Sequence, residues 1–252
     1  WRRGYNFMKK WALWQKIIGI ILLTGIILFS TGAIYVYQST YTASEVAQKQ
    51  SEQATHEKDY DLYSDGKSSE LGVIFYPGAF VAAESYSQWA SQVASAGYSV
   101  YVLHMPLNLA VFSKNAAQPI MDDHPNQSFI LAGHSLGGVI ASRFVAEHPK
   151  EVAGMIFLAS YPDEKGSLQD TNLPVLSITA SKDGVLNWEK YQKGKNYLPE
   201  KTDYIEIKGG NHAGFGMYGA QKGDSSATIT KKAQQTKISI CITEWLDKLK
   251  EK

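Results

Sequence analysis

A glycine-rich hexapeptide between an apolar run and a helix-like run is the feature that most constrains this fold. Residues 133–138 read GHSLGG, the run 128–132 (SFILA) precedes them, and the run 139–148 (VIASRFVAEH) follows. This layout predicts a strand that turns sharply into a helix and holds Ser135 in a strained backbone at the turn. Glycine is expected at positions 133 and 137 because a Cβ there would collide with neighbouring backbone. The bare pattern also arises by chance, so the flanking runs are what indicate a catalytic serine.

Apolar and amphipathic runs alternate along the rest of the chain from about residue 71. The alternation predicts a mostly parallel sheet with helices on both faces, because each βα unit returns the chain to the same sheet edge. We expect about six strands, since the polar stretch before residue 68 leaves room for little beyond a strand at 60–63. The expected strands are 71–76, 99–104, 128–132, 152–159, 175–180 and 203–208, and the expected helices are 82–96, 139–148, 186–193 and 227–250.

An uncharged segment near the N-terminus, Ile17 to Tyr37, predicts a membrane-spanning helix. It would extend about 31 Å as a helix, enough to cross a bilayer core. A cleaved signal peptide is the alternative, but the apolar run continues past the small residues 31–33, which favours an uncleaved anchor. Basic residues precede the segment, and none follows it until Lys49. This asymmetry predicts a cytoplasmic N-terminus and an extracytoplasmic remainder at the cell membrane.

Four segments are expected along the chain. They are a basic cytoplasmic N-terminus (1–16), a transmembrane anchor (17–37), a polar stalk (38–67) and a folded domain (68–252). The stalk is inferred from alternating polar and charged residues with few aliphatic ones. Met8 followed by two lysines reads like a natural start, so residues 1–7 are expected to be an upstream addition and are set aside.

Composition limits the partners. The single cysteine, Cys241, allows no intramolecular disulfide and is expected to be a buried apolar residue. Lysine and arginine number 25 against 24 acidic residues, without a basic cluster outside the membrane flank. We therefore expect no nucleic-acid binding. No cofactor or metal ion is expected either, and the sequence leaves the oligomeric state open.

A nucleophilic serine needs a general base and an acid that orients the base. His212 lies in the loop GGNHAGFG after the last expected strand, where glycines let a side chain project over the sheet edge. Asp183 directly follows the expected strand 175–180, and Asp163, after the preceding strand, is the alternative acid. The expected catalytic residues are thus Ser135, Asp183 and His212.

Acyl transfer also needs N–H donors for the developing oxyanion. The N–H of Leu136, directly after the serine, is expected to supply one. The second is expected from the loop 76–80 (YPGAF), with the Ala79 N–H first and Phe80 next. An ordinary strand-to-helix turn is the alternative for this loop.

Apolar side chains near the sheet edge are the expected substrate contacts. Phe80, His134 and Phe215 are the named candidates, with further wall residues in 106–112 and at Met217 and Tyr218. Core packing is the alternative for all of them and the favoured interpretation for three: Leu107, Leu109 and Val111.

The order Ser135, Asp183, His212 along an alternating chain resembles that of the α/β-hydrolase family. The segments YPGAF, MPLNLAVF (105–112) and GHSLGG are similar to those of a compact bacterial branch related to dienelactone-hydrolase-like proteins, over residues 71–249. The resemblance implies the α/β-hydrolase fold and a Ser-Asp-His triad. The chain departs from the pattern at two places. Dienelactone hydrolases use a cysteine where Ser135 stands, and many esterases have histidine where Pro77 stands.

These observations predict a membrane-anchored extracytoplasmic serine hydrolase. The favoured activity is that of a carboxylesterase that forms an acyl-enzyme on small or medium esters. Residues 160–174 are too few for a helical cap, so we expect an open site without a lid domain. The alternatives are an acyltransferase or peptidase with the same triad, and a non-catalytic surface binding protein on a hydrolase fold.

Overall fold

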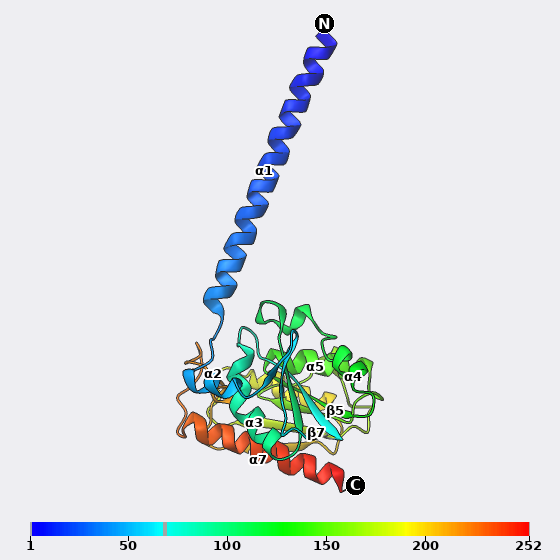
Figure 1. The fold of residues 1–252 in the computed structure, drawn as a ribbon, viewed down its shortest axis with the longest axis vertical. Coiled ribbons are helices and arrows are strands. Elements are labelled where there is room, and N and C mark those ends of the chain that lie inside the picture. Colours follow the sequence, from blue (N-terminus) through cyan, green and yellow to red (C-terminus); the bar gives the residue numbers. More distant parts are fainter. Residues whose placement is uncertain (1, 68–69, 252) are drawn as a thin grey trace. The chain divides into compact units, whose positions relative to one another are not determined.

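The structure is a computed structural model that describes residues 2–67 and 70–251. It divides into two units, Trp1–Thr40 and Tyr41–Lys252. The first unit is one helix, α1 (Arg2–Ser39). The second contains the sheet and the helices that cover it (Figure 1). The boundary therefore falls at residue 40, directly after α1.

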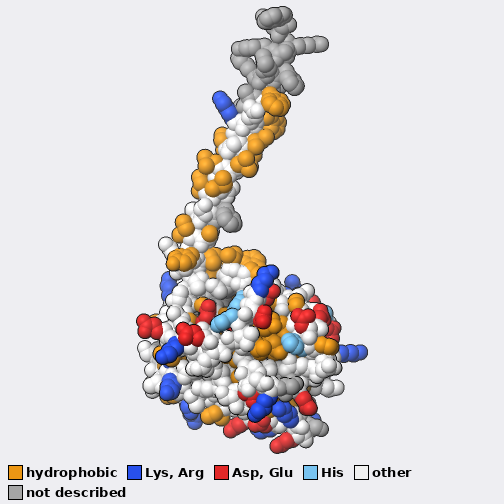
Figure 2. All heavy atoms as spheres, in the orientation of Figure 1, with side chains coloured by type: hydrophobic (Ala, Val, Ile, Leu, Met, Phe, Trp, Pro, Cys, Tyr) orange, Lys and Arg blue, Asp and Glu red, His pale blue; other side chains and the backbone are white. Residues whose placement is uncertain are grey.

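Helix α1 carries a window, Trp14–Ser39, that is long and apolar enough to cross a membrane. The window has 26 residues and a mean hydropathy of 2.5, and none of it is buried. Figure 2 shows hydrophobic side chains along this helix. An N-terminal signal sequence passes the same test of length and apolar composition, so the window fits either an anchor or a signal sequence.

The second unit is built on an eight-stranded sheet in the order β1-β2-β4-β3-β5-β6-β7-β8. Strands β3 to β8 run parallel, and β1 and β2 are antiparallel to their neighbours. The sheet therefore has two strands more than the six or so expected, because β1 and β2 extend its edge beside β4. The strands are β1 (Thr55–His56), β2 (Tyr60–Tyr63), β3 (Leu71–Tyr76), β4 (Ser99–Leu103), β5 (Ser128–His134), β6 (Gly154–Leu158), β7 (Val175–Ala180) and β8 (Asp203–Ile207).

Helices cover both faces of the sheet, as the alternation predicts. Alternate residues of β3 enter two separate cores: Val73 and Phe75 pack with residues of α3 and α7, whereas Ile74 and Tyr76 pack with residues of α4 and α5. Burial on both faces explains why the parallel strands read as continuous apolar runs. The helices are α2 (Glu45–Ser51), α3 (Ser87–Ser95), α4 (Gln118–Asp123), α5 (Leu136–Glu147), α6 (Trp188–Gly194) and α7 (Lys231–Lys250).

The segment 38–67, expected to be a stalk, is folded from Tyr41 onward. Ser44 caps α2, and Ala47 of α2 is fully buried and accepts a 2.8 Å hydrogen bond from the Ser87 hydroxyl. Strand β2 pairs with β4, which lies about forty residues further along the chain. The stalk prediction is corrected for this reason: the few apolar residues of the segment are satisfied by long-range contacts, which local composition does not reveal.

Candidate active site

The predicted strand–helix turn is present. Strand β5 ends at His134, α5 begins at Leu136, and Ser135 between them has φ 51° and ψ −123°. A non-glycine residue in this left-handed region is strained and persists only where its surroundings fix it. Here the Ser135 N–H donates to the Leu158 carbonyl at 3.0 Å, and the Ser160 hydroxyl donates to the Ser135 carbonyl at 2.6 Å. These bonds hold a half-buried Ser135 at the carboxyl edge of the sheet.

The glycines of the turn are required by close backbone approach. A Cβ on Gly133 would lie 2.5 Å from the Gly138 nitrogen. A Cβ on Gly137 would collide with the carbonyl oxygens of Tyr76 and Pro77 at the end of β3. Because the obstacles are backbone atoms, they cannot swing aside as a side chain can. Glycine therefore lets the start of α5 approach the loop that follows β3.

Asp183 and His212 form a buried pair. Asp183 Oδ2 lies 2.8 Å from His212 Nδ1, and both side chains are almost wholly excluded from solvent. The other carboxylate oxygen of Asp183 accepts the N–H groups of Val185 (2.9 Å) and Leu186 (2.7 Å), which fixes the carboxylate in the turn after β7. With Nδ1–H donated to Asp183, His212 Nε2 is left as an acceptor. This nitrogen is buried, and no described residue hydrogen-bonds to it.

The alternative acid, Asp163, is engaged elsewhere. It forms an ion pair with Arg143, and its side chain accepts the Gly166 N–H at 3.1 Å. Burial raises the pKa of Asp163, but the Arg143 guanidinium outweighs burial and leaves this pKa below its ordinary value. The structure thus pairs His212 with Asp183 and gives Asp163 a structural role between α5 and the loop that follows β6.

His134 lies beside His212 and is held neutral. Burial, and secondarily the neighbouring His212, lowers the pKa of His134 well below its ordinary value. Its ring centroid lies 4.6 Å from that of His212 and 5.6 Å from that of Phe215. The Tyr86 hydroxyl lies 3.0 Å from His134 Nδ1 and accepts the Gly78 N–H at 2.9 Å. The hydroxyl therefore bridges the Gly78 N–H and the neutral imidazole of His134.

Two backbone N–H groups at this edge are unengaged within the described chain. In the loop after β3, the Gly78 N–H is taken by Tyr86 and the Phe80 N–H by the Asn108 carbonyl at 2.8 Å. The Ala79 N–H between them has no protein partner among the described residues, and the same holds for the N–H of Leu136, the first residue of α5. Of the two donors expected in this loop, only Ala79 remains available.

The expected substrate contacts lie in different environments. Phe80 is half-buried, whereas His134 and Phe215 are buried and stack on each other. Tyr86, which sequence reasoning missed, is also fully buried. Core packing is wrong for Leu107 and Val111, which are 55% and 47% exposed. They lie in short 3-10 turns (Pro106–Asn108 and Ala110–Phe112), where Ala110 is the residue that packs into the core while Leu107 and Val111 point to solvent.

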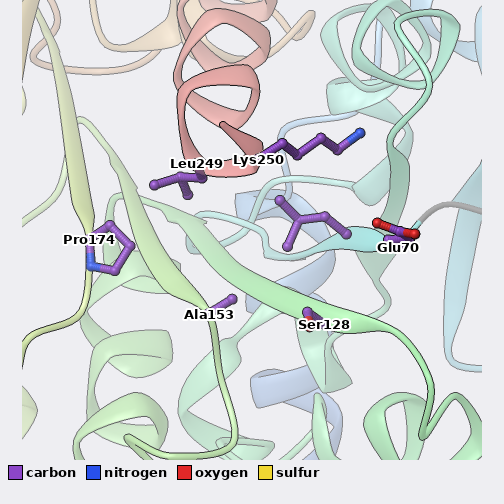
Figure 3. A pocket seen from close by; sticks show the side chains of 7 residues that line it. Glu70, Ser128, Ala153, Pro174, Leu249 and Lys250 are labelled. Carbon is purple, nitrogen blue, oxygen red and sulfur yellow. The ribbon is translucent and has the colours of Figure 1, made fainter. Parts of the chain in front are cut away.

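Two surface cavities help to locate the site. One of about 490 Å³ is bounded by Leu136 and Val139 of α5, by Tyr161 and by lysines 190 and 193 of α6, so it adjoins the turn at Ser135. The other, of about 380 Å³, lies at the opposite edge, where strands begin (Figure 3). Ser128, Ala153 and Pro174 meet the end of α7 there. This second cavity is separated by the length of the sheet from Ser135 and His212. Among the described residues, no cluster of three acidic, histidine or cysteine side chains could hold a metal ion.

The sheet order and the sharp strand–helix turn define the class of proteins with an α/β-hydrolase fold. Residues 72–236 match the alpha/beta hydrolase family. The chain belongs to this family. The match spans β3 to the first turn of α7, and so includes Ser135, Asp183 and His212.

Solved structures share the fold at low sequence identity. MGS-MChE2, an alpha/beta hydrolase enzyme from the metagenome of sediments from the lagoon of Mar Chica, Morocco, has a TM-score of 0.59 and 16% identity over 77% of this chain and 98% of its own. A dienelactone hydrolase from Anabaena variabilis has a TM-score of 0.54 and 15% identity, over 74% of this chain and 89% of its own. A monoacylglycerol lipase from Paleococcus ferrophilus has a TM-score of 0.56 and 15% identity, over 77% of this chain and 100% of its own. No curated protein matched the sequence.

Proposed function

We propose that this protein is a serine hydrolase that cleaves carboxylic esters. The observation that carries the proposal is the buried Asp183–His212 pair, whose free Nε2 belongs to the same sheet edge as the strained Ser135. Because the other nitrogen of His212 is held by Asp183, this Nε2 is the nitrogen able to accept a proton during a reaction. Family membership and the esterase-type names of the structural neighbours support the same reaction class.

In the proposed reaction, Ser135 Oγ attacks the ester carbonyl while its proton passes to His212 Nε2. Asp183 holds the Nδ1–H tautomer and stabilises the imidazolium. The tetrahedral oxyanion accepts the N–H groups of Leu136 and Ala79. Collapse breaks the ester C–O bond, and the alcohol leaves with the proton from Nε2. Water, deprotonated by His212, then attacks the acyl-enzyme and releases the acid and free Ser135.

We further propose that α1 is an uncleaved anchor and that the hydrolase unit is extracytoplasmic. Four basic residues of α1 lie before its apolar window and the fifth, Lys16, lies at the start of it, and the positive-inside tendency directs that end to the cytoplasm. A protease-protection assay on intact cells, with an epitope at either end of the chain, tests the orientation. Protection of the C-terminal epitope would overturn it.

Fluorophosphonate labelling of the full chain in detergent tests the serine assignment. We expect covalent labelling that is lost in Ser135→Ala, together with the hydrolysis of p-nitrophenyl butyrate. Ser95→Ala is the matched control, because Ser95 is an exposed helical serine that hydrogen-bonds only within α3. Equal labelling of wild type and Ser135→Ala would refute the proposal and favour a binding protein on this fold. Faster acyl transfer to an added alcohol or amine than to water would indicate an acyltransferase.

A further inference from the structure

The chain enters the compact unit between the loops that carry the proposed site. The Tyr41 N–H donates to the Phe80 carbonyl at 2.6 Å, and the Ala82 N–H donates to the Tyr41 carbonyl at 3.1 Å. Three residues later, the Ser44 N–H donates to the Met217 carbonyl at 2.7 Å. The segment 41–44 is thus hydrogen-bonded both to the loop that contains Ala79 and to the loop that follows His212.

The chain between this entry point and the end of α1 is very short. Only Thr40 separates Tyr41 from Ser39, where the apolar window ends. Two peptide links reach at most about 8 Å, whatever the orientation of the compact unit. The window Trp14–Ser39 is about 39 Å long as a helix, slightly more than a bilayer core. In a spanning α1, Tyr41 therefore lies at the headgroup layer.

The next loop in this hydrogen-bonded series exposes apolar side chains. Phe80, which accepts from Tyr41, donates its N–H to the Asn108 carbonyl at 2.8 Å. Paired backbones lie about 5 Å apart, so Asn108 is within about 15 Å of Tyr41. The interface loop, defined here as residues 106–112, exposes Leu107, Val111 and Phe112, and Phe112 is 63% exposed.

The backbone of the interface loop is itself strained. Leu107 and Asn108 have φ values of 55° and 53°, and two consecutive non-glycine residues in the left-handed region are unfavourable. Exposed apolar area in water is also unfavourable, and this cost is offset when the apolar side chains enter an apolar medium. The medium nearest to this loop by chain continuity is the membrane that α1 crosses.

We propose that the interface loop inserts into the outer surface of the membrane that holds α1, so that the protein takes acyl esters whose chains lie in that bilayer. The proposal rests on the proposed function and adds the substrate class. Residues 159–174, all of them described, contain one short 3-10 turn and no α-helix between β6 and β7. An ester at the bilayer surface therefore meets no helical cap from the segment between β6 and β7 before it reaches Ser135.

Loop insertion is tested without reference to catalysis. The full chain, with Cys241→Ala to remove its only thiol, carries Phe112→Cys labelled with the fluorophore NBD and is reconstituted in phosphatidylcholine vesicles. Ile240→Cys is the matched control, because Ile240 is 49% exposed on α7, outside the loops named above. We expect brominated lipids to quench the probe at position 112 at least about threefold more than the probe at 240. Equal quenching would overturn insertion, and so would a blue-shifted but unquenched probe at 112, because the loop would then pack against protein rather than lipid.

The substrate class is tested with two esters that share a leaving group. p-Nitrophenyl palmitate is presented in the same vesicles and p-nitrophenyl butyrate in water. We expect Leu107→Ser/Phe112→Ser to lower the palmitate-to-butyrate rate ratio at least about fivefold, and Ile240→Ser to leave the ratio unchanged. Quenching at 112 with an unchanged ratio would overturn the substrate class. If the wild type hydrolyses neither ester, the proposed function is refuted. The quenching experiment would still decide whether the loop inserts into the membrane.

Discussion

The imidazole rings of His134 and His212 lie 4.6 Å apart, yet only His212 is paired with a carboxylate. The pKa of His134 is lowered by burial and by its neighbour, so His134 stays neutral when His212 takes up a proton. A second cation at this distance would oppose the proposed imidazolium. The hydroxyl of Tyr86 completes the arrangement by joining His134 to the backbone of Gly78.

Removal of the Tyr86 hydroxyl should weaken both the fold and the site. In Tyr86→Phe, the buried Gly78 N–H and His134 Nδ1 each lose their partner, which costs about 1–3 kcal/mol for an unsatisfied buried group. We expect a lower free energy of unfolding in urea and a lower kcat on p-nitrophenyl butyrate. Tyr204→Phe, at an exposed tyrosine of β8, should change neither. Equal behaviour of the two variants would contradict the bridging role.

Neutralising the proposed acid should slow the reaction without unfolding the protein. Asp183→Asn keeps the shape of the side chain but no longer holds His212 in the required tautomer, and we expect kcat to fall by about 10³–10⁴. Asp163→Asn is the comparison, since Asp163 pairs with Arg143 at a partly exposed site. Its kcat should stay within a few-fold of wild type. If Asp163→Asn proves the more damaging of the two, the acid has been misassigned.

A methyl group at position 137 should disrupt the strand–helix turn. In Gly137→Ala, the new Cβ meets two backbone carbonyls that cannot move independently, and overpacking of this kind costs about 1–3 kcal/mol or more. We expect the free energy of unfolding measured in urea to fall by at least this much. Gly219→Ala is the control, because no atom lies within 4 Å of a Cβ there. A Gly137→Ala protein as stable as Gly219→Ala would show that the packing of α5 against the β3 loop is looser than described.

The contribution of the sheet edge at β2 to the free energy of unfolding should depend on pH through two side chains. Asp61 is buried, and His104 Nε2 lies 3.1 Å from its Oδ1. This hydrogen bond raises the pKa of His104, while the bonds to His104 and His56 outweigh burial and lower the pKa of Asp61. The stabilisation from His104 is thus complete below its unfolded pKa of about 6.5 and is lost as pH rises through the higher folded pKa. The stabilisation from Asp61 is lost only as pH falls below about 3.9, its unfolded pKa.

We therefore expect the free energy of unfolding to fall from pH 6 towards pH 8 by more in wild type than in His104→Gln. Urea titrations at both pH values measure the difference. His124→Gln provides the control, because among the described residues the His124 side chain makes a ring contact with Tyr101 but no hydrogen bond or ion pair. A parallel pH dependence in wild type and His104→Gln would exclude the linkage.

The sequence pattern predicted those structural elements that are formed by residues close together in the chain. The turn at Ser135 was readable because strand, glycines and helix are contiguous, and the buried strands were readable from their apolar runs. The sequence also favoured Asp183 over Asp163, because Asp183 directly follows an apolar strand. In the fold this strand is β7, which neighbours β8, and Asp183 pairs with His212.

Long-range contacts account for what the sequence did not predict. Strand β2 pairs with β4, and the segment 41–44 pairs with two distant loops, so the segment 38–67 looked polar and unstructured. Tyr86 gave no signal because its role depends on Gly78 and His134 meeting it in space. The exposure of Leu107 and Val111 could not be predicted either, since an apolar run in a loop has the same composition as one in a core.

The direct joining of α1 to the compact unit also affects how the protein could be shed. Proteases cut chain that can be drawn out into an extended, accessible segment. Tyr41 and Ser44 are instead hydrogen-bonded to neighbouring loops, and only Thr40 lies between Tyr41 and the last residue of α1. Release of the compact unit by cleavage after the helix would first require these bonds to open beside the loops of the proposed site. Shedding and loss of activity would thus begin with the same local unfolding event.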